Sequence, residues 1–225
     1  MQKTFALLFL FVALVAPAVA QRDIGVVDVD AGINALAVSV TSSNTELQNL
    51  ARVAFNAHGR YRLVATGGAF VLDFAPVSAT QVRVTVTRGG ATVHSETVAG
   101  TSARNALLRA ADVAVTKTSG LPGFFAGKLA FVSERGGQKT IMTGDLFFGE
   151  VQSYPVQGKQ IVGARWAPAG DKIIFTSFRT GFPDIYTLDL RTQQLATLVS
   201  FKGTNSGGRF SPDGSRVAMV LSGEG

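Results

Sequence analysis

The sequence predicts a small α+β domain followed by an all-β region that forms part of a β-propeller. Two observations lead to this prediction. A segment of the second half repeats at a spacing of 44 residues, and a four-stranded propeller blade takes ~40–45 residues. The first half instead mixes strand-like segments with two amphipathic helical segments, an order typical of a two-layer α+β sandwich.

The repeat aligns residues 128–146 with residues 172–190 without a gap, and nine of the nineteen positions are identical. The identical pairs are Lys128/Lys172, Phe131/Phe175, Ser133/Ser177, Arg135/Arg179, Gly137/Gly181, Ile141/Ile185, Thr143/Thr187, Asp145/Asp189 and Leu146/Leu190. The same shift carries Arg165, Pro168 and Gly170 onto Arg209, Pro212 and Gly214. A β-sandwich would not repeat its residues at a fixed spacing, whereas blades that bury both faces against neighbours do.

One complete blade can be traced from the pattern, with strands expected at 161–166, 172–177, 184–188 and 195–200. We expect the blades to start near residues 128, 161 and 208. The first has no segment that could serve as its first strand, so a strand from elsewhere would have to fill that place. Residues 124–225 therefore hold about two and a quarter blades, whereas a closed ring needs ~4–8. We expect the chain to be a fragment of a longer propeller protein.

The first twenty residues predict a secretory signal peptide. Lys3 precedes an uncharged apolar run, Pro17 breaks that run, and Ala18-Val19-Ala20 forms a cleavage site. The run is shorter than the roughly 20 residues that a membrane-spanning helix needs. We therefore expect an exported mature chain that begins at Gln21, lies in the periplasm and does not span a membrane.

Composition narrows the class of partner. The net charge of +6 comes from scattered cations without a stacking motif, so the sequence does not favour nucleic-acid binding. The chain has no cysteine and two histidines, His58 and His94, with no ligand spacing between them. We predict no metal, no cofactor and no catalytic residue.

The N-terminal α+β domain is expected over residues 21–121. Strands are predicted at 33–40, 61–65, 69–74, 81–87 and 91–98, because these segments are apolar or alternate apolar with polar residues. A capping-box sequence at 43–46 opens the first helix, and Gly59 is expected to end it in the left-handed conformation. A second helix begins near Thr101-Ser102, and residues 120–123 end it and form the linker to the blades.

The chain resembles the TolB family, the propeller proteins of the periplasmic Tol–Pal system. The blade sequences R-W-A-P-A-G-D-K-I-I-F-T-S (165–177) and R-F-S-P-D-G-S-R-V-A-M-V-L-S (209–222) carry the resemblance. Similar blades occur in other exported propellers, but the signal peptide and the α+β domain narrow the choice.

This resemblance implies a non-enzymatic adaptor that supports outer-membrane integrity and cell division. Its propeller would bind a peptidoglycan-associated lipoprotein through the segment before the F-S-P-D-G strand, where Thr204, Asn205 and Gly207 stand in this sequence. The start of the mature chain would bind a TolA-like protein, through Gln21, Arg22 and Asp23.

Two alternatives remain open at this point. The blades could belong to an exported serine peptidase, although the G-x-S-x-G elbow that carries the nucleophile of such enzymes has no match in this sequence. They could also form a carbohydrate- or peptidoglycan-binding propeller with aromatic residues at its mouth. Phe178, Phe182 and Trp166 are available, but Trp166 occupies the repeated strand end that Phe210 matches, so we interpret it as a packing residue first.

Overall fold

The computed structural model describes residues 35–154, 156 and 160–223. The expected signal peptide and the expected TolA-binding residues Gln21, Arg22 and Asp23 lie outside this part of the chain.

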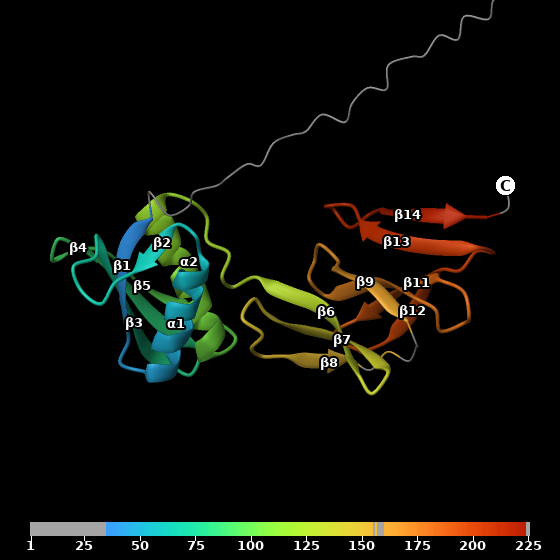
Figure 1. The fold of residues 1–225 in the computed structure, drawn as a ribbon, viewed down its shortest axis with the longest axis horizontal. Coiled ribbons are helices and arrows are strands. Elements are labelled where there is room, and N and C mark those ends of the chain that lie inside the picture. Colours follow the sequence, from blue (N-terminus) through green and yellow to red (C-terminus); the bar gives the residue numbers. More distant parts are fainter. Residues whose placement is uncertain (1–34, 155, 157–159, 224–225) are drawn as a thin grey trace, which may run out of the picture.

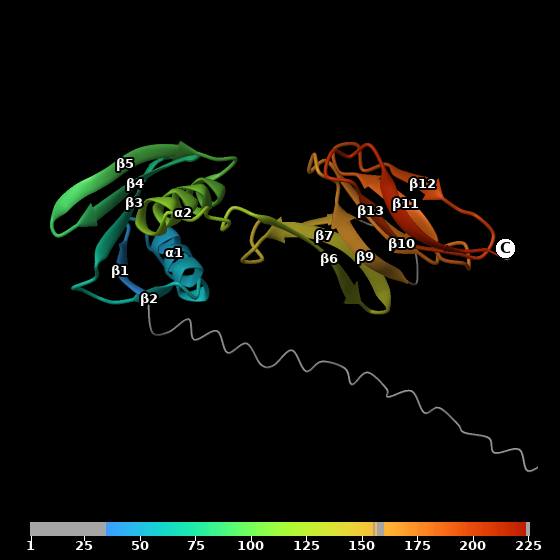
Figure 2. The ribbon, with the colours of Figure 1, turned by 90° about the horizontal axis from the view of Figure 1, so that it is seen from above.

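The N-terminal domain is a five-stranded mixed sheet with two helices on one face (Figures 1 and 2). Along the chain it contains β1 (Leu36–Thr41), α1 (Thr45–Ala57), β2 (Tyr61–Leu63), β3 (Phe70–Ser78), β4 (Gln81–Arg88), β5 (Ala91–Ala99) and α2 (Ala103–Ser119). The strand order is β2-β1-β3-β4-β5, and β1 runs parallel to both of its neighbours. Alternation decides the buried face: Val82, Val84 and Val86 are buried beneath α2, while the residues between them are more exposed.

The ends of the helices follow from local hydrogen bonds. Asn44 caps α1, because its side-chain oxygen accepts from the amide of Leu47. The expected left-handed end at Gly59 is wrong: α1 ends on His58 in an extended conformation, with the His58 amide bonded to the carbonyl of Phe55. Ser102 caps α2, and Gly120 ends it with a φ of 73°, which glycine adopts without steric cost.

The second half of the chain forms three antiparallel sheets that stand next to one another (Figure 1). The first contains β6 (Lys128–Arg135), β7 (Gln138–Asp145) and β8 (Gln152–Tyr154). The second contains β9 (Ile161–Trp166), β10 (Lys172–Ser177), β11 (Asp184–Asp189) and β12 (Leu195–Val199), in the order of a complete blade. The third pairs β13 (Thr204–Phe210) with β14 (Val217–Ser222), so its first strand begins four residues before the expected start.

The sequence repeat is also a repeat of backbone conformation. The turn glycines Gly137 and Gly181 both have positive φ, at 75° and 100°. Asp145 and Asp189 cap equivalent turns through one carboxylate oxygen, which accepts two backbone amides in each unit. These turn contacts explain why glycine and aspartate recur at the 44-residue spacing.

Each half has its own hydrophobic core. The first core lies between the mixed sheet and the two helices, and the second lies between the first two blade sheets. The linker is tied to the N-terminal domain, because the Asp112 carboxylate accepts from the amides of Phe125 and Ala126. The Phe125 ring is buried against Phe55, with ring centroids 5.3 Å apart. The α+β domain and the first blade therefore meet through a fixed segment.

Candidate partner-binding site

Asn205 is the centre of the segment that the sequence singled out, and the structure buries it to 1% exposure. Its side-chain amide donates to the carbonyl of Phe201 at 2.7 Å and to the carboxylate of Asp184 at 3.2 Å. Its side-chain oxygen accepts from the amide of Phe201 at 3.3 Å, and its own amide donates to the carbonyl of Pro183 at 2.9 Å. Asn205 thus joins the start of the third sheet to the second blade.

The two glycines that follow serve different purposes. Gly207 has a φ of 69° and lies in a register shift between β13 and β14, so it forms part of a β-bulge. Gly208 is buried, and an added Cβ would lie 2.8 Å from Ile174 and 2.9 Å from Ile185. The bulge and this close approach together place β13 against the sheet of the second blade.

A groove of about 540 Å³ opens beside this segment. It lies between the β10–β11 turn and the β12–β13 loop and is lined by Thr180, Phe182, Asp184, Ser200, Phe201, Lys202, Gly203 and Ser222. The rings of Phe182 and Phe201 are 68% and 66% exposed, although both are large and apolar. Asp184 is only 3% exposed and accepts from the hydroxyl of Thr180 and the amide of Asn205.

The groove therefore combines an exposed apolar rim with an internally bonded polar wall. Loops with this composition suit contact with another protein, since aromatic residues are enriched in interfaces. Of the predicted residues, Thr204 and Gly207 are exposed, while Asn205 is covered and acts through the loop that it holds. Phe201 was not singled out by the sequence, because an isolated apolar residue at the end of a strand is usually part of a core.

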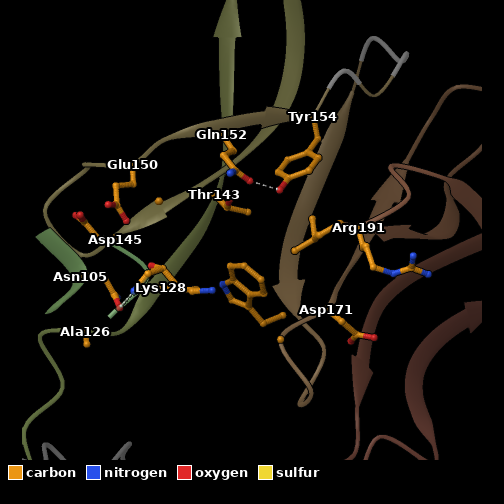
Figure 3. A pocket seen from close by; sticks show the side chains of 15 residues that line it. Asn105, Ala126, Lys128, Thr143, Asp145, Glu150, Gln152, Tyr154, Asp171 and Arg191 are labelled. Carbon is orange, nitrogen blue, oxygen red and sulfur yellow. Dashed lines mark hydrogen bonds between the residues drawn. The ribbon is translucent and has the colours of Figure 1, made fainter. Parts of the chain in front are cut away.

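A second cavity, of about 450 Å³, lies where the N-terminal domain meets the first two blades (Figure 3). Arg104 of α2 crosses this junction and donates to both carboxylate oxygens of Asp145, with nitrogen–oxygen distances of 2.5 and 3.2 Å. The Ser102 hydroxyl also donates to Glu150 across the junction. A Cβ added at Gly149 would lie 2.0 Å from the Arg104 guanidinium, so a side chain at this position would displace Arg104.

The electrostatics of Asp145 favour its ionised form. Burial opposes ionisation, but the hydrogen bond from Arg104 and those from the amides of Gly149 and Phe147 outweigh it, so the pKa of Asp145 lies below its usual range. The same contact raises the pKa of Arg104. This ion pair stays charged at neutral pH and fixes the junction.

In the part of the chain that the structure describes, no three histidine or acidic side chains come together as a metal-binding group. Its helices, α1 and α2, are each too short or too polar to cross a bilayer.

The fold and the groove define a class of protein. An α+β domain precedes three antiparallel sheets of three, four and two strands that stand next to one another, and the loops around them carry exposed aromatic rings. The chain is a β-propeller protein with an N-terminal α+β domain.

Residues 115–225 match the model of the TolB beta propeller domain. Over this part the chain is similar to the TolB family. The chain is 34% identical to the Tol-Pal system protein TolB of Azoarcus sp. (strain BH72) over 47% of its own length and 25% of the relative. It is 30% identical to TolB of Anaeromyxobacter sp. (strain K), over 56% of the chain and 29% of the relative. These alignments span about a quarter of each curated relative.

The fold likeness extends beyond the blades. The crystal structure of TolB from Acinetobacter baumannii superimposes with a TM-score of 0.75 at 22% sequence identity, over 85% of this chain and 56% of that one. At this identity the likeness concerns the fold. It confirms the expected α+β domain followed by part of a propeller.

Proposed function

We propose that this chain is the N-terminal part of a periplasmic adaptor in a Tol–Pal-like envelope system and carries out no chemistry of its own. Its propeller face binds a peptidoglycan-associated lipoprotein, and residues 21–23 at the start of the mature chain bind a TolA-like protein. The adaptor thereby supports outer-membrane integrity and cell division. The proposal is supported by the similarity of residues 115–225 to the TolB family and by the groove beside Asn205.

The single observation that carries the lipoprotein site is the pair of exposed rings, Phe182 and Phe201, on loops that Asn205 fixes. Each ring is about two-thirds exposed. Exposed aromatic side chains on a rigid loop offer large contact areas and lose little conformational entropy on binding, so they are frequent hot spots. Thr204 and Gly207 border the same face and would contribute contacts at its rim.

The test measures binding of the full-length periplasmic protein to its cognate lipoprotein by calorimetry. Phe201→Ser should weaken binding by at least about tenfold, since a central hot spot contributes roughly 2 kcal/mol or more. Phe148→Ser is the matched control, because Phe148 is also 66% exposed but lies in the first blade, away from the groove. Equal affinities for the two variants would contradict the proposed site, and the absence of binding by the unaltered protein would contradict the function.

A further inference from the structure

The junction cavity joins three parts of the molecule and is separate from the groove beside Asn205. Thr101 and Asn105 come from the N-terminal domain, Thr143 and Tyr154 from the first blade, and Trp166 from the second. Its volume of about 450 Å³ lies within the ~300–1,000 Å³ range of small-molecule sites. Such sites are common between domains.

Four of the side chains in the cavity wall that can accept hydrogen bonds already do so, whereas the Asp171 carboxylate, which also lines the wall, accepts none within the described residues. Asp145 accepts from Arg104 and from backbone amides, and Glu150 accepts from the Ser102 hydroxyl. The side-chain oxygen of Asn105 accepts from the amide of Thr101 at 3.2 Å. That of Gln152 accepts from the Tyr154 hydroxyl at 2.7 Å, as Figure 3 shows.

The hydrogen-bond donors of the same wall, in contrast, are not all used within the described residues. The indole nitrogen of Trp166 is buried and has no hydrogen-bond partner in the described structure. A buried donor without an acceptor costs about 1–3 kcal/mol, so its presence in a cavity wall calls for an acceptor from outside. The side-chain nitrogens of Asn105 and Gln152 add two further donors to the same wall.

Lys128 adds a positive charge to these hydrogen-bond donors. Lys128 extends into the cavity in Figure 3 and forms no ion pair within the described residues. The side chains of Asp171 and Arg191 point away from Lys128 in the same view. An ammonium group and a buried indole N–H from residues that line one cavity suit a carboxylate, which accepts hydrogen bonds and carries negative charge.

We propose that the junction cavity binds the carboxylate of a small organic acid, held by Lys128 and by the indole N–H of Trp166. Such a ligand would touch the α+β domain and both blades at once. Its binding would therefore favour the arrangement of the domains that the Arg104–Asp145 pair fixes.

Trp166 is the only tryptophan among the 225 residues, and the loss of its indole N–H signal in Trp166→Phe assigns that signal in the full-length protein. We would titrate the ¹⁵N-labelled full-length protein with N-acetylglycinate and, separately, with the neutral N-acetylglycinamide. The carboxylate should shift the indole proton downfield in a saturable manner, because the N–H acquires an acceptor. The amide should bind at least about tenfold more weakly, which corresponds to ~1.4 kcal/mol.

Lys128→Met tests the cation, and Lys172→Met is the matched control because Lys172 occupies the same repeat position in the second blade. Lys128→Met should weaken the carboxylate about tenfold and Lys172→Met should leave it unchanged, with dispersed backbone signals as the check on folding. An indole signal that does not move, an equal response to carboxylate and amide, or equal effects of the two lysine substitutions would each overturn the proposal. The comparison of the two ligands on the unaltered protein requires no variant.

Discussion

Replacing Asn205 by alanine should release the loop that carries Phe201. The substitution removes two side-chain hydrogen bonds to the Phe201 backbone, a long one of 3.4 Å to the carbonyl of Pro183 and one to the buried carboxylate of Asp184. Neutral bonds contribute about 1 kcal/mol each, and a bond to a charged group contributes about 1.5–3 kcal/mol. Because the four share one side chain and are not additive, we expect a loss of roughly 3 kcal/mol in local stability.

Hydrogen exchange of the full-length protein measures this loss where it occurs. The amides of Phe201 and Asn205 are bonded in the native structure. They should exchange about a hundredfold faster in Asn205→Ala, since every 1.4 kcal/mol corresponds to a factor of ten. Thr204→Ala, at the exposed neighbouring position, should change exchange by less than about threefold, as surface substitutions usually do. If Asn205→Ala behaves like Thr204→Ala, the structural role given to Asn205 is wrong.

Three further predictions concern the junction, the third sheet and the N-terminal segment. A double-mutant cycle of Arg104→Met with Asp145→Asn, followed by urea unfolding, should give a coupling of about 1–2 kcal/mol, above the ~0–1 kcal/mol of exposed pairs. Because the folded-state pKa of Asp145 is lowered, this coupling is present above the ordinary aspartate value of 3.8 and should be lost as the pH falls through the lowered pKa. A coupling that stays constant below pH 3.8 would contradict this pH dependence. Gly208→Ala should cost roughly 1–3 kcal/mol by overpacking Ile174 and Ile185, whereas Gly223→Ala, with no contact closer than 3.6 Å, should be neutral in the same unfolding assay. Removal of residues 21–23 from the mature protein should abolish capture of the TolA-like protein and leave lipoprotein affinity unchanged; loss of both would indicate a folding defect instead.

Much of the fold could be predicted because its signals are local. The 44-residue repeat indicates blades directly, since strands and turn residues such as Gly170 and Gly214 must recur together. Helix ends were less certain, because several polar residues compete for one cap. The capping box at 43–46 would place the N-cap at Ser43, whereas the structure uses Asn44. At the C-terminal end of α1, the His58 ring stacks on Phe124. Phe124 is distant in the sequence, so the residues around His58 do not indicate this contact.

The candidate site was predictable only as a segment. The resemblance indicated residues 202–208, but burial of Asn205 depends on Pro183 and Asp184, which lie about twenty residues earlier in the chain. The junction cavity had no sequence signal at all. Its walls come from α2, two blades and the linker, and their meeting depends on how the α+β domain is placed on the first blade.

The aspartate at the end of the third strand of each unit has a consequence for how such proteins are assembled. Asp189 uses its carboxylate for its own turn alone, whereas Asp145 caps its turn with one oxygen and also receives Arg104 on both oxygens. The duplicated unit thus supplied an attachment point without a new residue in the blade. Arg104 belongs to the α+β domain and determines which of the repeated aspartates joins that domain to the blades. Transplanting the α+β domain onto an unrelated propeller would therefore require this arginine and one turn aspartate whose carboxylate can accept it.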